Sequence, residues 1–283
     1  MLAIVGGLGA ALVFATVTLC NSRSSRLVGP TQLLAWVMLI GLAITAPIVA
    51  LQGIPDGLDA GSGGWLAVAG VGNVVGLLLA YAALRLGKVG IVAPMVSTQG
   101  ALAAVIAVVG GESIGTASGI VLGFIALGIF MAGIADDPGG GSEPPPEGLA
   151  NFYALGAAVA IGWSLYAVGR ASVKLPVAWA LIPSRLIGVA AVTLPVVLGA
   201  GLRMTREALP LVLISGVCEV LGFALFAFGA RHGIAVSAVL SSQFGAIAAV
   251  AAYFLFRERL APVQVAGVGL IVAGVGVLSG IRA

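Results

Sequence analysis

Two charged residues of this 283-residue chain, Glu219 and Arg185, lie well inside long apolar segments. A charged side chain among apolar residues is costly unless it meets a partner or lines a polar cavity, so both residues are candidates for function. The Glu219 carboxyl could take up and release a proton, and Arg185 could bind an anion or pair with Glu219. The alternatives are a permanently protonated core residue for Glu219 and a side chain that reaches toward the end of its segment for Arg185.

Polar residues also recur in two other apolar segments as similar triplets, Ser97-Thr98-Gln99 and Ser241-Ser242-Gln243. Their hydroxyl and amide groups could line a shared cavity. They could equally form hydrogen bonds that hold neighbouring helices together. Both interpretations stay open at this point.

Aromatic side chains offer another kind of contact, because the face of an aromatic ring binds cations and flat rings. Trp163 and Tyr166 lie three residues apart in one apolar segment and are the main candidates, ahead of Tyr81 and Trp36 in two others. The competing interpretation for all four is packing or anchoring at a membrane surface.

The composition indicates where these residues lie. Sixty per cent of the residues are hydrophobic and only 8% are charged, with a mean hydropathy of +1.19, so the chain lacks the polar residues that would cover a water-soluble domain. Ten apolar runs are long enough, at about 20 residues, to cross a membrane as helices. They are residues 2–20, 32–51, 65–84, 89–110, 114–134, 150–169, 177–199, 208–230, 233–256 and 262–281. We therefore expect an all-α integral membrane protein.

Residues 135–149 interrupt the apolar pattern. They contain four of the ten acidic residues together with four prolines and four glycines, a composition typical of a solvated, flexible linker. This linker separates a first half, residues 1–134, from a second half, residues 150–283. Each half holds five of the ten runs.

The two halves are related in sequence. At offsets of 144 to 147 residues they share many positions, among them Arg23 and Arg170, Arg85 and Arg231, Gln99 and Gln243, and Glu112 and Glu258. At an offset of 146 the counterpart of Glu219 is Asn73. Because each half has an odd number of spans, the second must enter the membrane from the opposite side. We expect two inverted five-helix repeats, with a site between them.

The chain resembles the EamA family of the drug/metabolite transporter superfamily. The resemblance rests on ten spans in one short chain, the internal duplication, and in each half a basic residue, a Ser/Thr-Gln pair and a Glu before the last span. It covers the whole chain, but its motifs are diffuse and imply the fold more than the substrate. It implies an exporter or exchanger of amino acids and other small metabolites, with both termini in the cytoplasm.

The distribution of basic residues disagrees with that orientation. With a cytoplasmic N-terminus, eight Lys and Arg residues would lie outside and four inside: Arg23, Arg26, Arg85, Lys88, Arg203, Arg206, Arg257 and Arg259 against Arg170, Lys174, Arg231 and Arg282. This is the reverse of the usual excess of positive charge on the inside. Ten spans place both termini on one side in either orientation.

Other classes of function find little support in the sequence. The chain has no phosphate-binding loop, a single histidine, and basic residues that are scattered and form no patch, so we expect no enzyme, metal, cofactor or nucleic acid. We expect a secondary transporter in the cell membrane, a monomer or homodimer, that exports a small metabolite by alternating access, driven by protons or by exchange. The alternatives are an importer of a cationic or amino-acid-like solute and a membrane scaffold or enzyme subunit.

Overall fold

A computed structural model describes residues 1–113, 115–133, 147–199, 201–256 and scattered positions between 262 and 277. The described residues form helices joined by short connections, and none of them lies in a strand. This confirms the expected all-α class. The expected linker, residues 135–149, lies almost entirely outside the described residues, so its flexibility stays a prediction.

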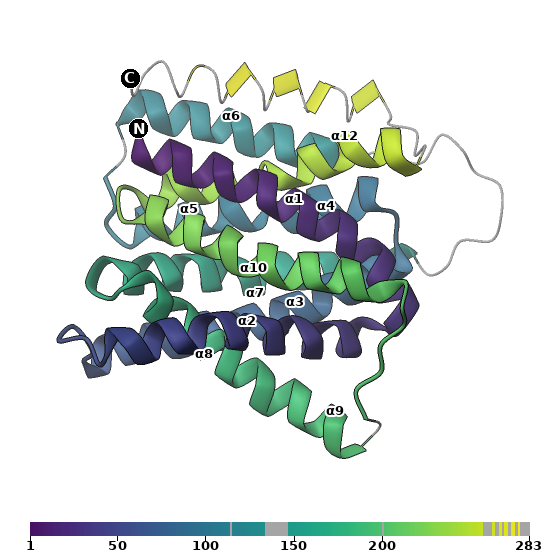
Figure 1. The fold of residues 1–283 in the computed structure, drawn as a ribbon. Helices are drawn as coiled ribbons and strands as arrows, with labels where there is room; N and C mark the ends of the chain where they lie inside the picture. Colours follow the sequence, from purple (N-terminus) through teal and green to yellow (C-terminus); the bar gives the residue numbers. More distant parts are fainter. Residues whose placement is uncertain are drawn as a thin grey trace.

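The helices cross the molecule back and forth in chain order (Figure 1). They are α1 (Leu2–Val28), α2 (Pro30–Gln52), α3 (Ala60–Leu86), α4 (Val89–Ser97), α5 (Gln99–Val109), α6 (Thr116–Gly133), α7 (Glu147–Lys174), α8 (Val177–Gly188), the short π-helix η1 (Val189–Thr193), α9 (Leu194–Gly199), α10 (Ala208–Ala230), α11 (Ile234–Ser241) and α12 (Phe244–Phe256). Three predicted spans are broken helices, formed by α4 with α5, α8 with η1 and α9, and α11 with α12.

Eight of the ten expected spans are helices long and apolar enough to cross a membrane. The fifth, predicted at residues 114–134, coincides with the 18-residue helix α6. The tenth, predicted at residues 262–281, falls mostly outside the described residues. The first span is longer than predicted: α1 continues to Val28 and does not end near Cys20. The polar residues that follow Cys20 stay within this helix, where hydroxyls such as that of Ser24, which donates to Cys20 O at 2.6 Å, find a partner in the helix backbone.

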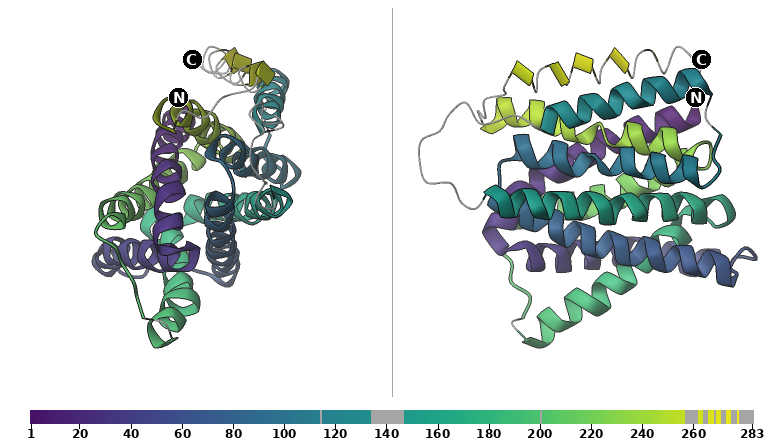
Figure 2. Two further views of the ribbon diagram at one scale, coloured as in Figure 1. Left: turned by 90° about the vertical axis from the view of Figure 1, so that its right-hand side faces the viewer. Right: turned by 180° about the vertical axis from the view of Figure 1, so that it is seen from behind.

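The helices run between two ends of a bundle (Figure 2). We call the end that holds Met1 and the starts of α3 and α8 the proximal end, and the end where α1 and α3 finish and α4 begins the distal end. Between the two halves of the chain, α1 packs along α10 and α3 packs along α7. The broken pair α4 and α5 crosses the broken pair α11 and α12. These helices surround the interior in which the candidate site lies.

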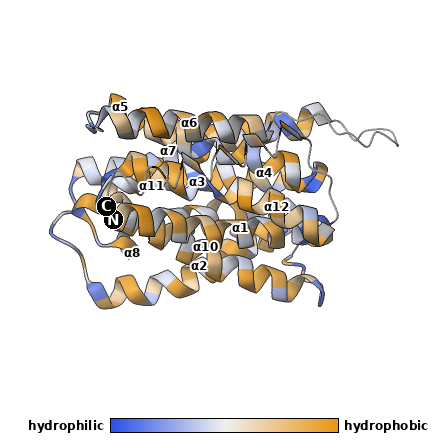
Figure 3. Cartoon of the chain, turned by 90° about the horizontal axis from the view of Figure 1, so that it is seen from above, coloured by the Kyte–Doolittle hydropathy of each residue, from blue (hydrophilic) through white to orange (hydrophobic). Residues whose placement is uncertain are grey.

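Apolar side chains cover the lengths of the helices, and hydrophilic residues gather at the two ends (Figure 3). Leu12 on α1, Val75 on α3 and Phe152 on α7 are large hydrophobic side chains that remain exposed. A continuous apolar exterior of this kind is stable against lipid chains, and the helices satisfy their backbone groups internally. The described part of the chain is therefore a multi-pass integral membrane protein.

Two close approaches fix the crossing of the broken spans. A Cβ on Gly100 of α5 would collide with the side chain of Ser242, and a Cβ on Gly245 of α12 would collide with that of Ser97. Glycine is needed at both positions because any side chain would push the helices apart. The polar triplets therefore lie where two broken spans meet.

Candidate functional site

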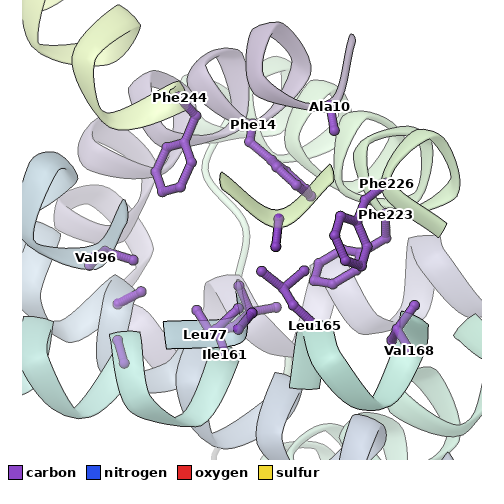
Figure 4. Packing of buried hydrophobic residues seen from close by; sticks show 14 of the residues in the cluster. Ala10, Phe14, Leu77, Val96, Ile161, Leu165, Val168, Phe223, Phe226 and Phe244 are labelled. Carbon is purple, nitrogen blue, oxygen red and sulfur yellow. The ribbon is translucent and has the colours of Figure 1, made fainter. Parts of the chain in front are cut away.

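A cavity of about 60 Å³ lies among α1, α3, α4, the start of α5, α7, α10 and α12. Phe14, Phe223 and Phe244 form one wall, with the ring centroid of Phe14 5.2 Å from that of Phe223 and 6.2 Å from that of Phe244. Leu77 and Ile161 form the opposite wall (Figure 4). A volume of this size holds only a few water molecules, so a larger solute requires the surrounding helices to move apart.

Polar groups form a smaller part of the cavity wall. They are the side chains of Thr18, Asn21, Tyr81, Gln99 and Glu219. Tyr81 and Glu219 are almost fully buried, as are Asn21 and Gln99. The cavity therefore joins an aromatic wall to a polar patch in the interior of the bundle, a combination typical of sites for small molecules.

Glu219 of α10 is paired with Arg185 of α8. Arg185 Nη1 lies 3.5 Å from Glu219 Oε1, and the two side chains are 0% and 1% exposed. Arg185 lies across Gly41 of α2, where a Cβ would come within 2.7 Å of Arg185 Cδ, and its Nη1 also donates to Met38 Sδ at 3.8 Å. The Arg185 side chain thus points into the bundle toward Glu219 and does not reach toward the membrane surface.

Four more polar side chains lie close to this pair. Asn73 of α3 hydrogen-bonds to Glu219. Tyr81, two turns further along α3, has its hydroxyl near Asn21 and Ser215, and Ser215 Oγ donates to Asn21 Oδ1 at 2.6 Å. We call Asn21, Asn73, Tyr81, Arg185, Ser215 and Glu219 the polar cluster. It draws its members from α1, α3, α8 and α10, so both halves of the chain contribute to it.

Several buried polar atoms in and near the polar cluster have no hydrogen-bond partner among the described residues. They are Asn21 Nδ2, Asn73 Oδ1, Tyr81 OH, Gln99 Oε1, Gln243 Oε1, and Arg185 Nε and Nη2. Leaving a buried polar atom unpaired costs about 1–3 kcal/mol, so such atoms are rare in folded proteins. Unused donors and acceptors beside a cavity can bind a polar ligand. Within the described residues, no group of three or more His, Cys, Asp or Glu side chains could hold a metal ion.

The two polar triplets contribute unequally to the cavity. Gln99 lines it, whereas Gln243 is not among its lining residues and donates from Nε2 to Val239 O. The hydroxyls of the other four members bond to backbone carbonyls three or four residues earlier in their own helices; these are Ser97, Thr98, Ser241 and Ser242. These four hydroxyls are therefore bonded to the backbone at the two helix breaks. Of the six triplet residues, Gln99 alone lines the cavity.

The aromatic candidates lie elsewhere. Trp163 of α7 is 46% exposed on the outside of the bundle, and Tyr166 packs edge-on against Trp163 and Trp65. The Tyr166 hydroxyl faces Gly110 at the proximal end. Neither Trp163 nor Tyr166 lines the central cavity, whose aromatic residues are Tyr81 and the three phenylalanines.

Asn21 and Ser215 are the members of the polar cluster that the sequence did not reveal, and a sequence signal exists for Asn21. Asn21 begins a polar run just after the apolar segment 2–20, and such a run reads as a loop. In the structure α1 continues, and Phe14, Thr18 and Asn21 lie at spacings of four and three residues on the face that lines the cavity. Extending the helical periodicity of Phe14 and Thr18 by one turn is the signal that identifies Asn21.

Comparison with known proteins supports a transporter fold. Residues 1–134 match the model of the EamA-like transporter family. A crystal structure described only as that of a protein is similar over 99% of this chain and 97% of its own, with 20% sequence identity and a TM-score of 0.72. At this identity the similarity establishes the fold alone. No curated protein matches this chain.

Proposed function

We propose that this chain, whose residues 1–134 match the model of the EamA-like transporter family, is a secondary transporter of a small amphipathic metabolite. In this proposal the solute binds in the central cavity, which opens to one end of the bundle at a time. The chain resides in the cell membrane with both termini on one side. The observation that carries the proposal is the buried, incompletely paired polar cluster beside an apolar cavity.

The proposed architecture is two inverted five-helix repeats, residues 1–134 and 150–283. Paired glycine contacts support it. Gly70 packs against Ile187, and its counterpart at an offset of 146 residues, Gly216, packs against Ile40. Ile40 is in turn the counterpart of Ile187 at an offset of 147 residues. A rotation that exchanges the two halves carries one contact onto the other, as inverted repeats require.

The position of the polar cluster supports the same architecture. Arg185 and Met38 are counterparts at an offset of 147 residues, and they contact each other. Glu219 and Asn73 are counterparts at an offset of 146 residues, and they also contact each other. Residues at equivalent positions meet only near the axis that relates the two repeats. The cluster therefore lies where inverted-repeat transporters bind their solutes.

The chemistry of the cavity favours an amphipathic solute. The phenylalanine wall suits an apolar or aromatic group, whereas Glu219 suits a cationic group such as an ammonium. Asn21 and Tyr81 offer donors for an oxygen atom, and Gln99 offers an acceptor. An amino-acid-like solute with an apolar side chain fits this set of contacts.

Proton coupling through Glu219 is the proposed source of energy, with export as the direction. Glu219 is the only acidic residue among the described ones that lies in the interior of a span, and it faces the cavity. Its carboxylate is held by Arg185 and Asn73. Binding of a cationic group or of a proton there competes with Arg185 for the same carboxylate. Such competition is the link that coupled exchange of solute and proton requires.

A transport screen tests the proposal. The purified protein is reconstituted in lipid vesicles with an imposed pH gradient and supplied with a library of labelled amino acids and related metabolites. We expect accumulation of at least one amphipathic solute, with the same result for Trp163→Ala, which changes only the outside of the bundle. Vesicles without protein provide the baseline. No transport above that baseline, by well-folded protein and across the library, would contradict the proposal.

A further inference from the structure

The two ends of the bundle are held together differently, and one arginine makes two hydrogen bonds at the proximal end. Arg231, which follows α10, donates from Nε to Ser172 O and from Nη2 to Leu175 O, both at 2.7 Å. These two carbonyls belong to the end of α7. Pro176, which follows them, has no N–H to donate to Ser172 O, so this carbonyl is open to an outside donor. A cation at a helix C-terminus is also favoured by the helix dipole.

A second proximal contact lies beside the first. Both carboxylate oxygens of Glu112, which follows α5, lie 3.2–3.3 Å from the backbone N–H of Ala235 in the first turn of α11. Glu112 and Arg231 line the same proximal cavity, which shares no lining residue with the central cavity. In this conformation the proximal end is therefore joined by charged contacts across α7, α10, α11 and the residues after α5.

The distal end holds the counterpart of Arg231 in a different state. At an offset of 146 residues this counterpart is Arg85, which lies in the last turn of α3, as Arg231 lies at the end of α10. Arg85 is exposed and has no hydrogen bond or ion pair to the described residues. It lines a distal cavity of about 420 Å³ together with Val92, and Val92 also lines the central cavity. In this part of the distal end, Arg26 Nη2 donates to Gly87 O at 2.9 Å.

A docking place for Arg85 nevertheless exists. The counterparts of Ser172 and Leu175 at an offset of 147 residues are Ser25 and Val28, in the last turn of α1. Ser25 O accepts one local bond, from Gly29 N, and a carbonyl can accept a second. The last turn of α1 thus offers Arg85 the carbonyl groups at the equivalent positions, with the difference that Ser25 O already accepts the Gly29 N–H, whereas Pro176 leaves Ser172 O without such a bond.

We propose that Arg231 and Arg85 are alternating latches, each of which closes one end of the bundle by docking on the carbonyl groups that end a helix of its own half. Arg231 is docked here and holds the proximal end closed, while Arg85 is released and the distal cavity adjoins the central cavity at Val92. In the opposite conformation Arg85 docks on Ser25 O and Val28 O and Arg231 is released. This inference rests on the alternating access of the proposed function.

The test measures how fast a maleimide labels single cysteines in the purified protein. In a background with both native cysteines replaced by alanine, one reporter is Ala107→Cys, buried in the proximal cavity, and the other is Asn151→Cys in the distal cavity. Arg231→Gln removes two charge-assisted bonds from the closed proximal end. We expect labelling at position 107 to rise by at least about tenfold and labelling at position 151 to fall.

The reciprocal variant and a matched control make the result specific. Arg85→Gln should leave labelling slow at position 107 and fast at position 151, because only the opposite conformation loses its latch. Arg170→Gln removes a cation that lines the same proximal cavity and lies over the Trp65 ring without docking on a helix end. It should leave both rates within about twofold, since cation–π contacts at exposed sites are weak.

Three results would overturn the inference: Arg231→Gln changes neither rate, it raises both rates equally as a loosened fold would, or Arg170→Gln reproduces its effect. If Arg231→Gln does not fold, Arg231→Lys replaces it, because lysine keeps the charge but lacks the planar fork for two carbonyls. That variant must likewise raise the labelling rate at position 107 and lower the labelling rate at position 151. Labelling requires no solute, so it can support the latch even if the transport screen fails.

Discussion

Removing one partner of the buried Arg185–Glu219 pair should destabilise the protein much more than removing both. At the observed 3.5 Å the attraction between the two charges is about 5 kcal/mol for an effective dielectric constant of about 20. Two guanidinium nitrogens of Arg185, Nε and Nη2, have no hydrogen-bond partner among the described residues, at a cost of about 1–3 kcal/mol each. These terms, together with the desolvation of both charges, leave the intact pair with a net contribution near zero.

The single substitutions remove the attraction but leave one charge buried. Arg185→Met, which introduces the residue found at the equivalent Met38, and Glu219→Gln should each lower the free energy of unfolding by about 3–5 kcal/mol. The double variant leaves no unpaired charge. It should lie within about 1 kcal/mol of the parent or above it.

Unfolding by SDS in mixed detergent micelles measures all four proteins of this cycle. These losses predict a coupling between the two sites of at least about 5 kcal/mol, far from additive. If the losses of the single variants simply add in the double variant, the pair is not a coupled unit. A loss below about 1 kcal/mol for both single variants would also refute the reasoning, because it would mean that solvent reaches the pair.

Three further results are expected. Gly100→Ala should lose about 1–3 kcal/mol or more of unfolding free energy, because its Cβ would collide with the backbone and a side chain of the crossing span. Gly64→Ala, which has open space at its Cβ, should be neutral or gain up to about 1 kcal/mol. Tyr81→Phe should raise the solute concentration for half-maximal transport severalfold by removing an unpartnered cavity hydroxyl, and Trp163→Ala should not change it. Asp59 accepts a bond from a backbone N–H at the start of α3, which lowers its pKa from 3.8 to about 2. Asp59→Ala should therefore reduce thermal stability at neutral pH, and the difference from the parent should be lost as the pH falls through about 2.

The apolar spans were predictable because they follow from residue type and spacing along the chain. A run of about 20 apolar residues has few stable alternatives to a membrane helix. Repeated glycines also carry information, since Gly70 and Gly216 recur where helices of the two halves touch. Pairing of Arg185 with Glu219 could be suggested from the sequence, because an unpaired charge inside an apolar span is costly.

The remaining parts of the site depend on contacts between distant segments. Asn21 belongs to the site only because α1 extends beyond its apolar run and because Ser215 of α10 lies beside it. Gln99 and Gln243 look equivalent in sequence, yet the break between α11 and α12 turns Gln243 toward its own backbone. Trp163 and Tyr81 cannot be ranked from sequence, because the direction in which a helix faces is set by the packing of α7 against α3.

The role of the Glu219 carboxyl is tested most directly by comparing two transport modes of one variant. Parent and Glu219→Gln proteins are reconstituted in vesicles with a solute found in the screen, and rates are expressed per folded protein. The account predicts that Glu219→Gln still exchanges labelled for unlabelled solute, at higher solute concentrations because the amide lacks the charge that binds an ammonium group, but no longer accumulates solute in response to an imposed pH gradient. If the variant accumulates solute as the parent does, Glu219 does not carry the proton and the proposed coupling is wrong.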